Sequence, residues 1–226
     1  MACTYAIPDV HGRLDLLDSA LTRIVDHAGG RQATLVLLGD YIDRGPASRQ
    51  VIERLIGFRS DTLKLVALKG NHEVMMVEAC SERVELNWWI ENGGGATLAS
   101  YGQSDAAIST AVVPRSDLQW ITDLALLHVD RHRVYVHAGV DPTLPLKLQT
   151  ERTLLWKIYP DGYGMGHGLR HVVHGHHANV KGPVVTRGKT NLDSMAWKTG
   201  RLVVGVFNDE RPGPATDYLE ILGPPA

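Results

Sequence analysis

The 226-residue sequence has few of the features that mark secreted or membrane-spanning proteins. Its two cysteines, Cys3 and Cys80, are too few for a disulfide framework. The apolar runs, such as residues 34–38 and 202–207, are the length of a strand and far shorter than the ~20 residues of a membrane-spanning helix. No basic and apolar leader follows Met1. We therefore expect a cytoplasmic protein that neither spans nor binds a membrane.

The sequence also lacks an excess of charge of one sign. It has 23 Lys and Arg against 25 Asp and Glu, a net charge of −2, which argues against a nucleic-acid partner held by bulk electrostatics. Phenylalanine occurs only twice, whereas histidine occurs 11 times, a bias toward groups that bind metals or transfer protons. With 44% hydrophobic residues at this length, we expect one domain over residues 1–226.

Short apolar runs in this sequence repeatedly end in polar residues and glycine. Runs of aliphatic residues bounded by glycine and proline predict buried strands. We expect strands over residues 5–7, 35–38, 65–68, 134–136, 172–173, 184–186, 201–207 and 218–222.

Segments with the apolar spacing of a helix lie between the first of these strands. Leu14, Leu17, Leu21 and Ile24 fall on one helix face, and residues 85–101 also have a helical pattern. Strand, loop and helix repeat three times in the first half, which predicts a layered α/β domain. The second half has more strands and fewer helices, so we expect a second, mixed sheet packed on the first.

The strand ends carry ligand-type side chains. In α/β sheets, loops from several strands meet beyond their carboxyl ends, and ligands bind there. Three carboxylates, one amide and four imidazoles would reach this rim: Asp9, His11, Asp40, Asp43, Asn71, His72, His137 and His176. Mixed oxygen and nitrogen donors suit Mn, Fe or Zn better than Ca or Mg. They are too many for one ion, and one carboxylate can bridge two ions ~3.5–4 Å apart.

Each of these residues has a simpler explanation when it is taken alone. An aspartate such as Asp9 at a strand end is most often a turn or helix-capping residue. A histidine in an apolar run is most often a buried side chain with a satisfied hydrogen bond. Arg44 would be a surface ion-pair partner, although its planar fork also suits phosphate oxygens. These explanations do not account for five strand ends in one chain that all carry ligand-type residues.

The motifs at these strand ends resemble those of the phosphoprotein phosphatase family of metallophosphoesterases. They read PDVHG at 8–12, GDYIDRG at 39–45, GNHE at 70–73, HAG at 137–139 and GHH at 175–177. Residues 89–102 also resemble a stretch of bacterial members, which include phage-type protein phosphatases and diadenosine tetraphosphate hydrolases. The resemblance implies a calcineurin-like fold, in which two mixed β-sheets pack as a sandwich flanked by helices.

The resemblance also implies a role for each matching residue. His72 would protonate the leaving oxygen, Asp43 would orient His72, and Arg44 would bind the phosphate. Two divalent cations, manganese in preference to iron or zinc, would share Asp40 and be held by six residues: Asp9 and His11 on the first, Asn71, His137 and His176 on the second, and Asp40 on both. Two cations would activate a water for in-line attack on phosphorus.

One family feature is missing. Related bacterial members tend to have Trp-x-Arg after an apolar pair, whereas this sequence has Trp156, Lys157 and Ile158. Lys157, Arg152 and Arg170 are candidate replacements for the second phosphate-binding arginine, although the ammonium of Lys157 lacks the bidentate fork of a guanidinium.

Three functions fit these observations. We expect a metal-dependent phosphomonoesterase, a serine/threonine protein phosphatase acting on a phosphorylated protein or peptide. The alternative is a diadenosine tetraphosphate (dinucleoside polyphosphate) hydrolase, which would need aromatic or cationic platforms for the bases. The sequence offers five aromatic residues that could form such a platform, and we interpret them as packing in the core or in loops: Trp88, Trp89, Trp156, Tyr159 and Tyr163. A non-catalytic binding module is the third possibility, and the complete set of donors argues against it.

Overall fold

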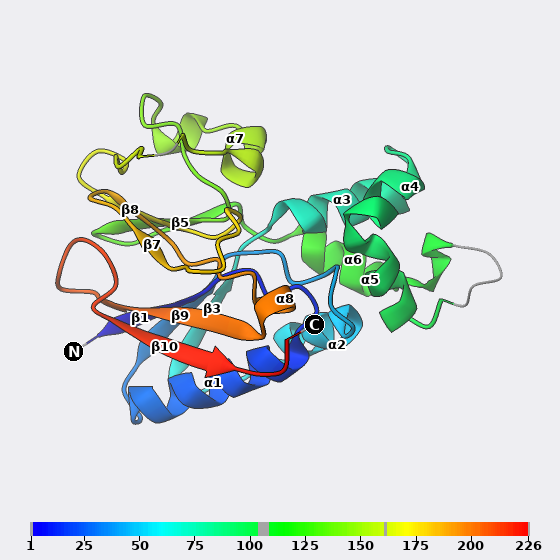
Figure 1. The fold of residues 1–226 in the computed structure, drawn as a ribbon, viewed down its shortest axis with the longest axis horizontal. Coiled ribbons are helices and arrows are strands. Elements are labelled where there is room, and N and C mark those ends of the chain that lie inside the picture. The colour runs from blue at the N-terminus through cyan, green and yellow to red at the C-terminus, as the bar shows by residue number, and fades with distance from the viewer. Residues whose placement is uncertain (1, 104–108, 161, 226) are drawn as a thin grey trace.

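The computed structural model describes residues 2–103, 109–160 and 162–225 and has two five-stranded sheets (Figure 1). The first sheet has the order β10-β9-β1-β2-β3, with β1 at Cys3–Ile7, β2 at Ala33–Leu37, β3 at Leu63–Ala67, β9 at Arg201–Asn208 and β10 at Asp217–Leu222. The second has the order β4-β5-β6-β8-β7, with β4 at Leu127–Val129, β5 at Arg133–Val136, β6 at His171–His174, β7 at Val184–Val185 and β8 at Lys189–Asn191.

The first sheet forms around three parallel strands joined by helices. β1 pairs in parallel with β2, and β2 with β3, so that Ile7 lies opposite Leu37. Helices α1 (Leu14–Ala28) and α2 (Ser48–Ile56) make the crossovers. As the spacing predicts, α1 buries Leu17 and Leu21 against the sheet.

The second sheet packs on the first, which confirms the expected α/β sandwich. β5, β6 and β8 pair in parallel, while β4 and β7 pair antiparallel at the edges, so the sheet is mixed. Apolar side chains from both sheets fill the space between them: Ala6, Val36, Leu38, Leu68, Tyr135, Val173, Leu192 and Phe207. This core brings the carboxyl ends of β1, β2, β5 and β6 to one rim.

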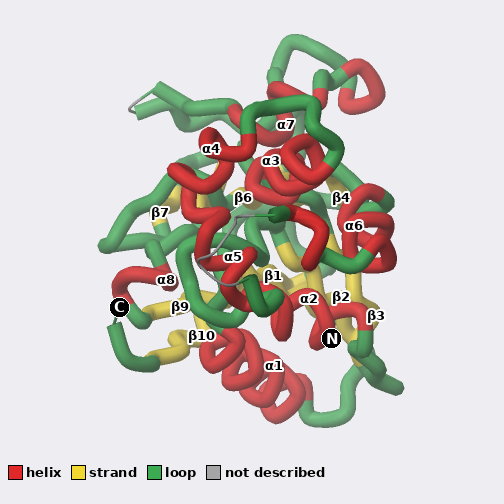
Figure 2. Tube along the Cα trace, turned by 90° about the vertical axis from the view of Figure 1, so that its right-hand side faces the viewer, coloured by secondary structure: helices red, strands yellow, loops and turns green. Residues whose placement is uncertain are grey.

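Short helices surround the sandwich (Figure 2). They are α3 (Asn71–Cys80), α4 (Leu86–Trp89), η1 (Ile90–Gly94), α5 (Gly95–Ser100), η2 (Thr110–Val112), α6 (Arg115–Thr122), η3 (Leu146–Leu148), α7 (Glu151–Trp156) and α8 (Ala196–Thr199). Among the described helices, none is long and apolar enough to cross a membrane.

The helix expected over residues 85–101 is not continuous. Gly93 has a φ of 111°, which breaks the helical path between η1 and α5. A Cβ at Gly93 would lie 2.8 Å from the side chain of Arg44 and 2.9 Å from its backbone nitrogen. The break therefore lets this segment approach the loop that carries Arg44.

Candidate metal centre

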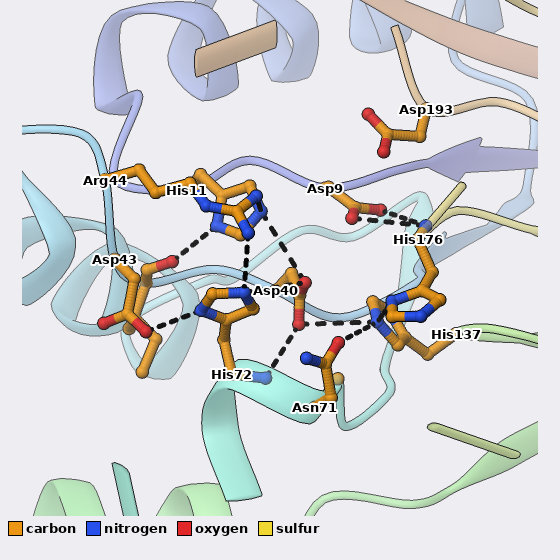
Figure 3. A network of polar contacts seen from close by, with 12 residues as sticks. Asp9, His11, Asp40, Asp43, Arg44, Asn71, His72, His137, His176 and Asp193 are labelled. Atoms are coloured by element: carbon orange, nitrogen blue, oxygen red, sulfur yellow. Dashed lines mark hydrogen bonds and ion pairs between the residues drawn. The ribbon is translucent and has the colours of Figure 1, made fainter. Parts of the chain in front are cut away.

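Five loops meet at one rim, as the sequence predicts (Figure 3). Asp9 and His11 follow β1, and Asp40 lies in the loop that follows β2. Asn71 and His72 begin α3 after β3, while His137 and His176 follow β5 and β6. All eight predicted side chains, Asp43 included, lie in this neighbourhood; seven are buried, and His176 is half-buried.

The backbone of this rim adopts a conformation that is rare for side-chain-bearing residues. His11, Asp40, Asp43, Arg44 and His176 all have a positive φ, between 45° and 71°. Such turns reverse the chain within one residue and aim consecutive side chains into the same space.

A neighbouring glycine makes room for the Asp40 carboxylate. A Cβ on Gly70 would lie 2.1 Å from Asp40 Oδ1 and 2.4 Å from the Asp40 nitrogen. Only glycine leaves that space open, which explains the glycine that precedes Asn71 and His72.

Asp40 lies at the centre and contacts imidazoles on both sides. Its Oδ2 is 3.6 Å from His11 Nε2 and 3.9 Å from His72 Nε2. Its Oδ1 is 3.5 Å from His137 Nε2. Two groups of possible metal ligands result, His11–Asp40–His72 and Asp40–His137–His176, and Asp40 belongs to both. A shared carboxylate is the arrangement that a two-metal centre needs.

The hydrogen bonds leave the imidazoles ready to bind a cation. His11 Nδ1 donates to the carbonyl of Ile42 at 2.7 Å, and His137 Nδ1 donates to that of Leu38 at 3.0 Å. Because a carbonyl can only accept, each Nε2 then carries a lone pair rather than a proton, and in His11 that lone pair accepts from the guanidinium of Arg44. Burial lowers the pKa of both rings well below the usual value, so both are neutral.

Electron-pair donors crowd around His137 with too few protons to bond to one another. Its Nε2 lies 2.8 Å from Asn71 Oδ1, 3.2 Å from His176 Nδ1 and 3.5 Å from the Asp40 carboxylate. At most the His176 nitrogen can donate a hydrogen among these atoms. A divalent cation would satisfy such a cluster, so the residues present fit the predicted metal.

Asp9 stands slightly apart from both groups. Its carboxylate accepts hydrogen bonds from the His176 backbone N–H at 3.1 and 3.2 Å. Burial and the neighbouring Asp193 raise the pKa of Asp9 well above its usual value. Asp193, which the sequence analysis left out of the site, lies shortly after β8 and beside Asp9 (Figure 3). The role of Asp9 as a ligand stays a prediction.

Asp43 and His72 form a buried hydrogen-bonded pair. His72 Nδ1 lies 2.6 Å from Asp43 Oδ2. Trp89 Nε1 donates to the same oxygen at 2.9 Å, and Thr97 Oγ1 donates to the other at 2.6 Å. Burial raises the pKa of Asp43 to about 7, against the effect of these two donors. Burial, and after it the charge of Arg44, lowers the pKa of His72 well below its usual value.

Trp89 and Thr97 therefore belong to the site. Neither residue received this role from the sequence analysis. Trp89 is fully buried, as expected for a packing residue, but its indole N–H also holds the Asp43 carboxylate. The sequence feature that could have indicated them is the resemblance over residues 89–102, which includes both Trp89 and Thr97.

Glu73 is a further residue to which the sequence analysis gave no role. Its buried carboxylate accepts three backbone hydrogen bonds of 2.8 Å, from the N–H groups of Asp40, Tyr41 and Gly70. It thereby ties the loop after β2 to the start of α3. The last letter of the GNHE motif thus holds the backbone of the site in place.

Arg44 reaches into the middle of the site. Its guanidinium donates to His11 Nε2 at 2.8 Å and to His72 Nε2 at 3.1 Å, and it lies 5.5 Å from the centre of the Trp197 ring. Lys157 instead places its ammonium 5.4 Å from the centre of the Tyr159 ring. Phosphate binding by either residue stays a prediction.

A buried rim where one carboxylate joins two sets of imidazoles, beside a guanidinium, defines a metal-dependent phosphoesterase. The chain belongs to the calcineurin-like phosphoesterase family, whose model matches residues 4–207. This family uses a dinuclear metal centre. The identification agrees with the resemblance found in the motifs.

Curated proteins that the chain resembles include enzymes named for hydrolysis of a dinucleoside tetraphosphate. The symmetrical bis(5'-nucleosyl)-tetraphosphatase of Pseudomonas putida (strain W619) is 31% identical over 177 residues, 71% of this chain and 54% of the relative. The chain spans about half the length of the curated relatives it matches.

Solved structures share the fold at low identity. A crystal structure assigned provisionally as a diadenosine tetraphosphatase has a TM-score of 0.67 at 18% identity, covering 98% of this chain and 93% of that one. A serine/threonine phosphatase from Saccharomyces cerevisiae, similar to human PP5, has a TM-score of 0.63 at 16% identity, covering 98% and 80%. At these identities the likeness shows the fold alone.

Proposed function

We propose that this protein hydrolyses the phosphoanhydride chain of a dinucleoside polyphosphate such as diadenosine tetraphosphate. The observation that supports this substrate is the similarity to relatives named symmetrical bis(5'-nucleosyl)-tetraphosphatase. It favours the alternative weighed from the sequence over the protein phosphatase that we preferred there. The packing role expected for the aromatic residues counted against this alternative, and the exposure of Trp88 and Trp156 weakens that objection.

The donor set supports hydrolysis at phosphorus. His11, Asp40 and His137, together with their neighbours in the two ligand groups, would hold two divalent cations, for which we propose manganese. When bound, such ions supply Lewis-acid charge that lowers the pKa of a water and offsets the negative charge of the phosphate oxygens. The neutral imidazoles and the shared carboxylate need no rearrangement of the backbone to do so.

Arg44 would bind the phosphate that is attacked. Its guanidinium donors already converge on the space between His11 and His72. Phosphate oxygens can replace these neutral acceptors, and a charge-assisted bidentate pair is stronger than a bond to an imidazole. Its position over the Trp197 ring limits the directions in which the side chain can swing.

His72 would deliver a proton to the leaving oxygen from Nε2, for which the ring must first gain a proton, because burial lowers its pKa and Nε2 accepts from Arg44 in this structure. Asp43 fixes the ring through Nδ1 and stabilises the imidazolium, while Trp89 and Thr97 hold Asp43 in place. A phosphate leaving group is less basic than an alkoxide, so this proton matters less for an anhydride than for a phosphate ester. The same site can therefore act on both bonds with different reliance on His72.

A direct comparison of substrates tests the proposal. We would measure kcat/KM for diadenosine tetraphosphate and for a phosphoseryl peptide with one Mn-loaded preparation, and repeat both with a chelator. Chelator-sensitive preference for the dinucleotide is expected. Preference for the peptide would restore the protein phosphatase, and no turnover of either substrate would favour a binding module.

A further inference from the structure

A groove beside the metal centre lies between two sets of helices. It has a volume of about 620 Å³ and runs between α3 and α4 on one side and α7 on the other. Its lining includes Val74, Glu78, Trp88, Arg152, Leu155 and Trp156. Trp88 comes from α4 and Trp156 from the end of α7, so the groove joins segments far apart in the sequence.

The two tryptophans are exposed, contrary to the packing role expected from the sequence. Trp88 is 39% exposed and Trp156 37%, whereas the adjacent Trp89 is fully buried. Large aromatic side chains that neither fill the core nor bond to a polar partner cost free energy in water. A pair of them at the edge of a catalytic site therefore indicates a surface that binds a ligand.

The geometry of the pair fits a flat ligand. The ring centres lie 6.4 Å apart and the planes are inclined by 30°. A planar ring held between two aromatic rings needs them ~7 Å apart, twice the contact distance of ~3.5 Å between carbon atoms. A small rotation of the exposed rings gives that separation, and a ligand can alternatively stack on one open face.

The groove also adjoins the reacting centre. Trp156 packs edge-on against His176, a candidate metal ligand, with ring centres 6.4 Å apart and an interplanar angle of 83°. A group stacked on Trp156 would therefore lie close to a ligand bound at the metal centre.

The charges of the groove favour a base rather than the phosphate chain. Glu78 and Glu151 outnumber Arg152 among its charged residues, so an anionic chain would be repelled there. The carboxylates can accept hydrogen bonds from the exocyclic amino group of a purine. A flat, uncharged ring with amino donors matches this surface.

We propose that Trp88 and Trp156 form the platform for one nucleobase of the dinucleoside polyphosphate substrate. The inference rests on the proposed function and names the part of the substrate that the groove binds. The polyphosphate runs from this base to Arg44 and the metal centre. Specificity for a nucleotide then comes from the wall formed by α4 and α7.

Single substitutions on the platform test the inference. Trp88→Ala and Trp156→Ala should each lower kcat/KM for diadenosine tetraphosphate by about 5- to 150-fold, because stacking on an aromatic ring contributes ~1–3 kcal/mol per base. Trp156→Phe should retain most of the activity, since it keeps an aromatic face. Leu169→Ala, at a fully exposed position outside the groove lining, is the matched control and should change nothing.

A base-free probe separates recognition from damage to the site. Inorganic tetraphosphate carries the phosphate chain without bases, so its inhibition constant should stay within about twofold of wild type in both alanine variants. Loss of tetraphosphate binding, or a lowered melting temperature in the alanine and phenylalanine variants alike, would assign the tryptophans a structural role and overturn the platform.

The outcomes also separate the two proposals. If wild type hydrolyses diadenosine tetraphosphate and both alanine variants keep their kcat/KM, the platform is wrong and the proposed function stands. If wild type hydrolyses only the phosphoseryl peptide, the proposed function is wrong, and the platform falls with it.

Discussion

The loops of the two sheets contribute to the site in different ways. The loops after β1, β2 and β3 supply carboxylates, an amide and the His72–Asp43 pair, and Glu73 fixes their backbone with three hydrogen bonds. The loops after β5 and β6 add two imidazoles and lie near the exposed aromatic wall. The loops of the first sheet thus carry most of the candidate metal ligands, and those of the second carry one side of the groove that we propose binds the base.

The two halves also differ in the size of their hydrophobic cores. The large core cluster covers the first sheet and its helices α1 and α2. The cluster under the second sheet is small and consists of Val134, Val136, Val140, Leu154 and Val172. α7 packs on the small cluster through Leu154, whereas α4 is anchored in the large one through Trp89, so the α7 side of the groove can change with less loss of stability.

Asp40 joins the two halves, and its replacement should have the largest effect. Asp40→Asn removes the charge shared by both ligand groups, so we expect turnover to fall by at least ~10³-fold and the content of both metals to drop. Elemental analysis and steady-state kinetics measure this. Asp26→Asn, on the exposed face of α1, is the control. Normal metal content and turnover in the Asp40 variant would contradict a shared ligand.

His72→Asn tests whether His72 acts in proton transfer without being needed for metal binding. We expect full metal content and a loss of ~10²–10⁴-fold for a phosphate ester, the usual contribution of a general acid. The loss for diadenosine tetraphosphate should be smaller, because its leaving group is less basic. A lost metal in this variant would show that His72 is a ligand, as its 3.9 Å distance to Asp40 Oδ2 permits.

Glu73→Gln tests the backbone support of the first half. One of the carboxylate oxygens that accept from Asp40, Tyr41 and Gly70 becomes an amide group that cannot accept. We expect the free energy of unfolding in chelator to fall by about 2–4 kcal/mol, the cost of one or two buried bonds to a charged group. Urea titration measures it, with the exposed Glu82→Gln as control. An unchanged urea midpoint of unfolding would show that Glu73 does not support the backbone in this way.

The smallest effect concerns the thiols, which lie outside both halves of the site. Burial raises the pKa of Cys80 to about 11, so roughly a thousandth of the thiol is ionised at pH 8. Alkylation of Cys80 should be slow at pH 8 and accelerate about tenfold per pH unit up to the pKa. Peptide mass spectrometry gives the rate. Rapid labelling that also abolishes turnover would point to a cysteine nucleophile.

Much of the framework could be predicted from the sequence because its signals are local. Apolar runs that end in ligand-type residues predict the strands and place Asp40, His137 and His176 at one rim. The hydrogen bonds from Trp89 and Thr97 to Asp43 span 46 and 54 residues, and no periodicity encodes them. They emerge only when the helices pack.

The substrate wall was harder to predict for a related reason. Trp88 and Trp89 are neighbours on one helix, so their side chains point about 100° apart and only one can face the core. The sequence does not say which. The packing of α4 against α3 buries Trp89 and leaves Trp88 facing α7.

The left-handed backbone at the rim has a consequence for the evolution of the protein. A non-glycine residue in that conformation costs on the order of 1–3 kcal/mol, and five of the predicted site residues adopt it. Glycine at position 44 would relieve that strain and remove the guanidinium. If Arg44 binds the phosphate as we propose, a search for thermostable variants would therefore tend to select inactive ones, because stability and turnover make opposite demands on this position.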